Sequence, residues 1–297
     1  MRNYNFLILI VSAAAVGAAL IEGLVYTLRR PGSYDWKGSF ASLAIAAGRR
    51  LTDIVPLAVA LPGGFWLHEH RILELSPDSG AGLLALFIAL EFCYYWFHRA
   101  NHRVRLFWAT HAVHHSPNQL NLSAAYRLGW TGKVTMTLIF FSPIALLGFT
   151  PLQIAAAFSL NLLYQFWIHT AWMPRLGVLE YVLNTPSAHR VHHAANLEYL
   201  DANYGGVLIV FDRLFGTYVA EREAMPCRYG LVKPLQTCNP ITIAFHQWGP
   251  LFRDLWRARS VRAVLGHLFG PPGWAPDGPG ETTDAMRSRA ARSGAGS

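Results

Sequence analysis

The stretch EFCYYWFHRANHRVRLFWATHAVHH, residues 91–115, holds five of the thirteen histidines of the chain within eighteen residues. They form two sets: His98 and His102 are four residues apart, and His111 stands three and four residues before His114 and His115. Residues three or four apart share one face of a helix, so each set can direct its imidazoles at one point. The fold therefore has to bring these side chains together.

Two further groups of histidines lie downstream. The motif HRVHH repeats the second spacing with His189, His192 and His193, and His169 in FWIHT follows an apolar run. Imidazole is a ligand for Fe, Zn, Cu and Ni, and one ion takes at most about six protein ligands. Nine histidines therefore predict two metal ions. Separate surface or core histidines, the alternative for any isolated residue, do not explain three sets with matching spacing.

The composition indicates a membrane protein. Of the 297 residues, 53% are hydrophobic and only 14% are charged, whereas about a quarter are charged in soluble domains. The net charge of +8 does not predict a nucleic-acid partner, because the arginines stand beside apolar segments. The three cysteines form neither a paired set nor a C-x-x-C motif, which argues against a disulfide framework or an iron–sulfur cluster.

Five apolar runs are candidates for membrane spans, which take about 20 apolar residues. They cover residues 5–27, 51–67, 81–97, 134–149 and 152–168. The first is expected to be a retained helix and not a signal peptide, because it is long and is followed by Arg29 and Arg30. Prolines interrupt the second, and the last two are expected to form a helical hairpin. We expect an all-α integral membrane protein with about four to five transmembrane helices.

Basic residues alternate between the loops that join these runs. They gather in the loop after the first run and in the segment 98–133, whereas the hairpin tip has none. The positive-inside rule then puts the N-terminus outside, and the histidine sets in a cytoplasmic helical cap. Residues 1–80 are expected to be N-terminal transmembrane helices, 81–270 a catalytic domain with an amphipathic interfacial segment at 240–269, and 271–297 a disordered tail.

The order HRANH, HAVHHS, FWIHT and HRVHH resembles the fatty acid hydroxylase and sterol desaturase superfamily, membrane enzymes with a histidine-ligated di-iron centre. The likeness runs from Glu91 to about Trp274 and includes the motifs EFCYYWFHR, NLSAAYR, NYGG, DRLFGTY, YGLVKP and PPGW. These flanks are most similar to the bacterial sterol desaturase-like branch, which is also similar to alkylglycerol monooxygenase. The histidine spacing is typical of the superfamily but does not define a substrate.

The resemblance implies a set of iron ligands. They are His98, His102, His111, His114, His115, His169, His189, His192 and His193. Glu91 lies seven residues before His98 on the same helical face, so it is expected either to orient an imidazole or to pair with an arginine as a buried polar residue. The other four histidines, His68, His70, His246 and His267, match no set and are expected to be ordinary interfacial residues.

The implied function is O2-dependent hydroxylation or desaturation of an unactivated C–H bond in a membrane lipid such as a sterol, fatty acyl chain or ether lipid. Asn121, Arg127, Asn203 and Tyr204 are candidates for contact with the lipid head group, or are turn and capping residues. The chain has no flavin or nicotinamide fingerprint, no haem attachment motif and no ferredoxin cysteines. Electrons must therefore come from an external donor such as a ferredoxin, a b-type cytochrome or a reductase.

Two other classes of protein use clustered histidines. A membrane zinc hydrolase needs a glutamate general base as in H-E-x-x-H, and none of the three sets contains one. A histidine-rich metal-binding or transport protein is expected to place ionisable residues inside its spans, whereas here they gather at the span ends. The Ala-, Arg- and Gly-rich composition favours a bacterial source and so a multi-pass protein of the cytoplasmic membrane.

Overall fold

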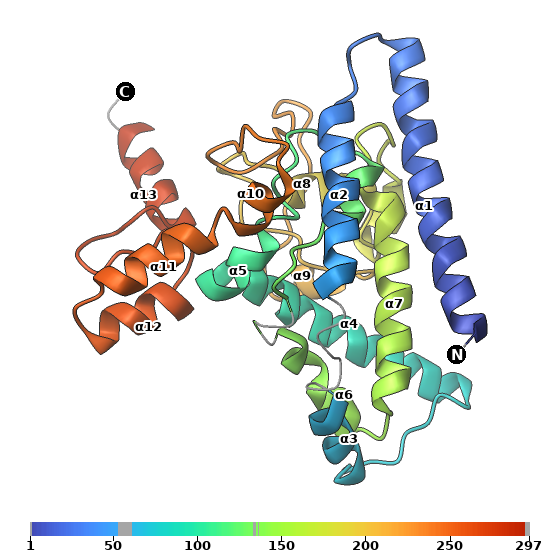
Figure 1. Ribbon diagram of the computed structural model, residues 1–297. Helices are drawn as coiled ribbons and strands as arrows, with labels where there is room; N and C mark the ends of the chain where they lie inside the picture. Colours follow the sequence, from blue (N-terminus) through green and yellow to red (C-terminus); the bar gives the residue numbers. More distant parts are fainter. Residues whose placement is uncertain (1, 53–60, 133–134, 136, 295–297) are drawn as a thin grey trace.

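The computed structural model, shown in Figure 1, describes residues 2–52, 61–132, 135 and 137–294. Within these ranges the fold is helical, and β-structure is limited to isolated bridges such as the one between Leu183 and Leu208. The α-helices are α1 (Arg2–Arg29), α2 (Trp36–Thr52), α3 (Leu61–Glu69), α4 (Gly80–Arg103), α5 (Arg105–His111), α6 (Ser142–Leu146), α7 (Pro151–Ile168), α8 (Pro186–His192), α9 (Val210–Leu214), α10 (Pro240–Phe245), α11 (Trp248–Arg257), α12 (Val261–Phe269) and α13 (Thr283–Gly294). The 3₁₀ helices are η2 (Leu122–Tyr126), η3 (Thr137–Phe141) and η4 (Gly177–Tyr181).

Among the described residues, two helices are long and apolar enough to cross a membrane. They are the Ile10–Arg29 part of α1 and the whole of α4, and they correspond to the predicted runs 5–27 and 81–97. Helix α7 coincides with the predicted run 152–168 and has 18 residues. The predicted run 51–67 lies partly outside the described residues, and its end belongs to α3.

Residues 134 and 136 of the predicted run 134–149 lie outside the described residues, and its described stretch 137–149 is not one spanning helix, which corrects the expected hairpin of two spans. It contains the short elements η3 and α6, with Pro143 in the first turn of α6. Gly148 then has a φ of +111°, and a Cβ there would lie 2.6 Å from the backbone nitrogen of Leu75. The apolar residues of this run therefore pack as short turns against α4, where Phe141 and Ile144 are buried.

Helix α2 (Trp36–Thr52) covers residues 36–50, which the sequence indicated to be a loop, and the first two residues of the predicted run 51–67. Ala41 and Ile45 lie four residues apart and bury the same face against Val113 and Ile243. The basic residues at the end of the segment had suggested a polar connection. The apolar residues that precede Arg49 and Arg50 give the helix a buried face, and tertiary packing of that face stabilises it.

The tail was expected to be disordered, but it contains helix α13. Arg103, the last residue of α4, forms an ion pair of 2.8 Å with Asp284. Arg287 donates hydrogen bonds to the backbone carbonyls of Leu197 and Leu200. Docking contacts of this kind order a segment whose composition alone favours disorder, and they bring the C-terminal region against the end of α4.

Helices α4 and α7 deliver their C-terminal ends to the same region. α4 begins with the Ser79 side chain capping Gly82, and α7 begins with a capping box between Thr150 and Gln153. The two helices pack together and are joined by a hydrogen bond of 2.9 Å from the hydroxyl of Tyr94 to the side-chain carbonyl of Gln165. Histidines therefore stand at both C-terminal ends, with His98 and His102 in the last turns of α4 and His169 directly after α7; both helices are labelled in Figure 1.

Candidate metal centre

The first histidine set stands in the last turns of α4. His98 and His102 are both buried, and their rings lie 5.3 Å apart between centroids. The Nδ1–H of His98 donates to the backbone carbonyl of Tyr204 at 2.8 Å, since a carbonyl can only accept. This bond leaves the Nε2 lone pair of His98 free to bind a metal, as in other metal-ligating histidines.

The second and third sets are less helical than their spacing indicated. Helix α5 ends at His111, and His114 and His115 follow in a turn, whereas α8 holds His189 and His192 and is capped by His193. Thr185 caps the start of α8, with Pro186 in its first turn. The turn geometry still directs these imidazoles into the same space as those of α4.

His169 caps the C-terminal end of α7, where it joins the other histidines. Its Nδ1–H donates to the carbonyl of Gln165 at 2.7 Å. Its Nε2 lies 3.2 Å from Nε2 of His114 and 2.9 Å from Nε2 of His189. The lone histidine of FWIHT is therefore part of the same centre as the others.

The nine histidines divide into two groups, and within each group one ring nitrogen of every histidine lies within 4.8 Å of those of the others. One group has five members, His98, His102, His111, His115 and His192, and the other has four, His114, His169, His189 and His193. His115 of the first group stacks against His193 of the second with ring centroids 4.4 Å apart. The groups are therefore adjacent, which is the arrangement that a dinuclear site requires.

Several of these imidazoles carry buried nitrogens that have no hydrogen-bond partner among the residues that the structure describes. The Nε2 atoms of His102, His192 and His193 are examples. A buried polar atom without a partner costs free energy, and in native proteins it usually marks a bound ion or water. The donor set is neutral imidazole nitrogen throughout, which suits iron or zinc. Metal coordination therefore accounts for these nine side chains better than hydrogen bonds among the histidines do.

Burial also keeps the imidazoles neutral, as a metal ligand must be. It lowers the pKa of His192 from 6.5 to about 3 and that of His114 to about 4. The same cause, reinforced by neighbouring imidazoles, holds four other pKa values well below 6.5: those of His111, His115, His189 and His193. Near neutral pH the centre therefore offers lone pairs and no competing protons.

Glu91 plays neither of the roles expected from the sequence. Its carboxylate accepts hydrogen bonds from the backbone N–H groups of Val207 and Leu208, both at 2.8 Å, and from the side-chain amide of Asn161. No histidine or arginine is among these partners. Glu91 instead joins α4, α7 and the loop 203–208, and that loop carries the carbonyl that orients His98.

The loop 203–208 also binds a second buried carboxylate, that of Asp212 in α9, which the sequence did not indicate as a functional residue. Asp212 accepts hydrogen bonds at 2.7 Å from the N–H groups of Tyr204 and Gly205 and from the hydroxyl of Thr217. Gly206 follows where a Cβ would lie 2.3 Å from the amide nitrogen of Asn161. The motifs NYGG and DRLFGTY were the available signal, since their glycines and their aspartate shape this turn.

The four residues expected near the lipid head group have different environments. Asn121 caps η2 by accepting from Ser123, and Asn203 donates to the carbonyls of Ala188 and Val219, which favours the capping alternative for both. Tyr204 is buried beside His102, with ring centroids 5.3 Å apart. Arg127 is 3% exposed, and its Nε has no hydrogen-bond partner.

Arg190, in the third histidine set, is held by a buried ion pair. Its guanidinium binds both carboxylate oxygens of Glu221 at 2.8 and 2.7 Å and also donates to the carbonyl of Met173 at 2.8 Å. It therefore ties α8 to the segment that follows His169. The bidentate pair holds the guanidinium in one orientation, and the bond to Met173 then connects α8, which carries His189, to the segment after His169.

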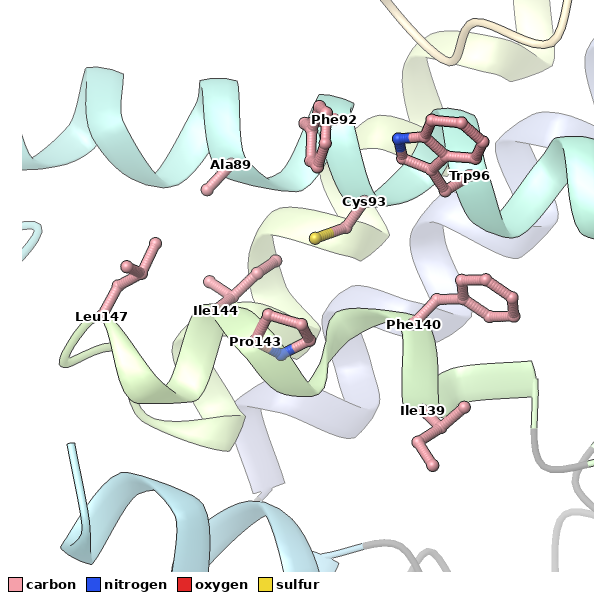
Figure 2. Close-up of a pocket in the computed structure, with 9 residues that line it drawn as sticks. All are labelled: Ala89, Phe92, Cys93, Trp96, Ile139, Phe140, Pro143, Ile144 and Leu147. Carbon is pink, nitrogen blue, oxygen red and sulfur yellow. The ribbon is translucent and has the colours of Figure 1, made fainter. Parts of the chain in front are cut away.

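An apolar cavity of about 590 Å³ lies between α4 and the segment 139–147, as Figure 2 shows. It is lined by Ala89, Phe92, Cys93, Trp96, Ile139, Phe140, Pro143, Ile144 and Leu147. On α4, Ala89, Phe92 and Trp96 share one face, and His98 and His102 lie on the opposite one. The cavity therefore opens away from the histidines and is not the place where chemistry at the metal centre would occur.

Comparison with known proteins agrees with this geometry. Residues 83–217 match the family model described as fatty acid hydroxylase. The matched segment contains both histidine groups and the loop 203–208. Residues 83–217 therefore carry a fatty acid hydroxylase domain, and the resemblance seen in the motifs is confirmed.

Particular relatives are similar over most of the chain. The chain is 38% identical to the alkylglycerol monooxygenase of Homo sapiens over 88% of its own length and 57% of that protein. It is 31% identical to the ornithine lipid hydroxylase of Rhizobium tropici, over 55% of the chain and 50% of that protein, and 30% identical to a sterol desaturase of Aspergillus fumigatus, over 57% and 47%. The chain thus spans about half the length of these relatives. No solved structure gives a significant match.

Proposed function

We propose that the chain is a non-haem di-iron oxidoreductase that hydroxylates a C–H bond of a membrane lipid, with an ether lipid as the first candidate. The observation that supports this most is the pair of adjacent histidine groups, with five and four members, whose ring nitrogens converge. The relatives named monooxygenase and hydroxylase act on lipids by their names, which supports the substrate class. Desaturation is the second outcome, since one relative is named a sterol desaturase.

The nine histidines would hold two iron ions, one in each group. When bound, an iron pair supplies O2 activation and removal of hydrogen from an unactivated C–H bond. The residues around the pair exclude water, since eight of the nine histidines are buried. The carbonyls of Tyr204, Gln165 and Ala202 accept hydrogen bonds from His98, His169 and His192 and so fix the ring orientation of these three.

Arg127 is proposed to contact the polar head of the lipid. Burial lowers the pKa of its guanidinium to about 10, so the group remains charged near neutral pH. Within the described part of the chain the guanidinium has no ion pair, which is unfavourable for a buried cation, and an anionic or polar ligand would relieve that cost. The buried Nε2 of His246 has no hydrogen-bond partner among the described residues. Burial lowers the pKa of His246, and the positive charge of Arg127 lowers it further. Both groups offer hydrogen bonds that the protein does not satisfy.

We also propose that the metal centre lies on the cytoplasmic side of a membrane and receives electrons from an external donor. The alternation of basic residues supports the orientation. A zinc hydrolase is disfavoured because neither histidine group includes a carboxylate and because Glu91 bonds to backbone and amide groups. A metal transporter is disfavoured because the nitrogens form two closed groups and do not follow a path across α4.

Isotope labelling tests the reaction directly. Cells that express the intact chain, and cells that express a variant without His189, are grown under ¹⁸O2, and their lipids are compared by mass spectrometry. The proposal expects a lipid that gains one ¹⁸O atom only with the intact chain. A lipid that loses two hydrogens without gaining oxygen would identify desaturation instead. Hydrolysed lipid products that carry no ¹⁸O would contradict oxidation.

A further inference from the structure

Helices α11 and α12 lie on the side of the molecule opposite α1, as Figure 1 shows. They form a helical hairpin joined by the short segment 258–260, and they pack against each other and against α5. The inner face of α11 buries Trp248 and Leu251 together with Ala109 of α5. The pair is therefore a fixed part of the fold.

Arg105 fixes this pair at the end of α4. It follows the last residue of α4 by two positions, and its guanidinium binds Asp254 of α11 and His267 of α12. Its backbone N–H also donates to the carbonyl of Gly270 at 2.9 Å. If α4 crosses the bilayer, α11 and α12 lie where the chain leaves it, at the level of the histidines.

The outer face of the pair is apolar and exposed. Trp256 is 92% exposed and Phe252 lies one turn before it on α11, while Val261, Leu265 and Phe269 repeat every four residues along α12. Val261 is 75% exposed. Five large exposed apolar side chains on two helices that pack against each other are of the kind that marks an interaction surface. We name these five residues the α11–α12 face.

Four arginines accompany the residues of the α11–α12 face in the sequence. They are Arg253, Arg257, Arg259 and Arg262, and all four are exposed. Between residues 240 and 270 the sequence has one acidic residue, Asp254, which is paired with Arg105. Exposed aromatic and aliphatic side chains with arginines at the rim are typical of helices that lie in a membrane interface, where the guanidinium groups reach phosphates.

We propose that the α11–α12 face inserts into the interfacial layer of an anionic membrane leaflet, on the side where α4 ends. The five apolar side chains enter the region between head groups and acyl chains, and the four arginines bind lipid phosphates. The segment then holds the cap against the bilayer. The net positive charge also argues against a second copy of the chain as the occupant, because a symmetric pairing would set these arginines against one another.

The position of the face can be measured with spin labels on the full chain in vesicles of phosphatidylcholine and phosphatidylglycerol. Labels are attached to Trp256→Cys or Val261→Cys after Cys238→Ser removes the exposed native thiol. Cys93 is buried, and burial raises the pKa of Cys227 to about 12, so the remaining thiols react slowly. Ser288→Cys, at an exposed position on α13, is the control.

The proposal expects the spin labels at 256 and 261 to be more accessible to dissolved oxygen, which collects in the bilayer, than to a water-soluble nickel chelate. The label at 288 should show the reverse order. In the double variant Arg257→Glu/Arg262→Glu, the label at 256 should become more accessible to the nickel chelate. Equal nickel access at 256 and 288 would overturn the proposal. Protection of the label at 256 in detergent, together with a doubled particle mass, would also overturn it, because a second copy would then cover the face.

Discussion

The Nδ1–H of His98 donates a hydrogen bond to the backbone carbonyl of Tyr204, 106 residues away in the chain, at 2.8 Å. The N–H of the same Tyr204 donates to Asp212 at 2.7 Å. One peptide segment therefore connects a histidine of the five-histidine group to a buried carboxylate. The orientation of His98 depends on the loop 203–208, which contributes no ligand of its own.

Asp212 gives a pH dependence whose sign can be stated. Burial raises its pKa from 3.8 to about 6. The folded state therefore binds the proton more tightly than the unfolded state, and stability falls as pH rises from about 4 to about 6. A shift of this size corresponds to ~3 kcal/mol. We expect Asp212→Asn to remove this part of the pH dependence in thermal unfolding, and an unchanged pH profile would contradict the assignment.

Glu91 should contribute stability through its three hydrogen bonds. In Glu91→Ala, the N–H groups of Val207 and Leu208 and the amide of Asn161 lose their acceptor inside the protein, at about 1–3 kcal/mol for each group left unpaired. We expect a lower unfolding temperature and weaker retention of metal through the displaced loop. Glu91→Gln keeps one acceptor oxygen, so its unfolding temperature and metal retention should lie between those of the intact chain and those of Glu91→Ala. Equal metal content in all three proteins would limit Glu91 to a role in stability.

The histidine motifs allowed the centre to be predicted because their chemistry is local. Four-residue spacing placed His98 and His102 on one face of α4, and both are there. The helical reading of HAVHH was wrong in detail, since α5 ends at His111. The imidazoles of this set still point into one site, because a turn can also direct neighbouring side chains to one point.

Long-range partners could not be predicted from spacing. Glu91 bonds to residues 70, 116 and 117 positions away, and no periodic pattern encodes such separations. The helix α13 was missed for a similar reason, because its order depends on contacts such as Arg103 with Asp284. The run 134–149 shows the opposite error: hydropathy indicated a span, but Pro143 and Gly148 divide the backbone into short turns.

The two histidine groups predict about two metal ions per purified chain. Iron is expected, and elemental analysis of protein purified without chelators measures both identity and number. The centre requires neutral nitrogens, so acid should release the metal. One zinc ion per chain with no iron would contradict the di-iron assignment.

Single ligand changes should distinguish the two groups. His189→Ala leaves three imidazoles in the four-histidine group, whereas His192→Ala leaves four in the five-histidine group. We therefore expect His189→Ala to lose about one metal ion per chain and His192→Ala to lose less, with turnover abolished in both. The matched control is His70→Ala, which changes an exposed histidine that bonds to the carbonyl of Trp66. A similar loss in the control would mean that the assignment of ligands is wrong.

The last prediction concerns Arg127 and separates binding of the lipid from binding of metal. The guanidinium is buried and its Nε has no partner, so the proposed head-group contact would supply one. Arg127→Gln removes the charge and keeps an amide donor, while Arg127→Lys keeps the charge and loses the planar fork.

A hydrogen bond to a charged group contributes about 1.5–3 kcal/mol, so we expect Arg127→Gln to raise KM roughly tenfold or more while kcat and metal content stay close to those of the intact chain. The KM of Arg127→Lys should lie between those of the intact chain and Arg127→Gln if the lipid group is anionic, because charge then matters more than geometry. Metal content and lipid turnover are measured on the same preparation. If Arg127→Gln loses metal in proportion to activity, the residue supports the fold around His114 and the contact with the lipid head is excluded.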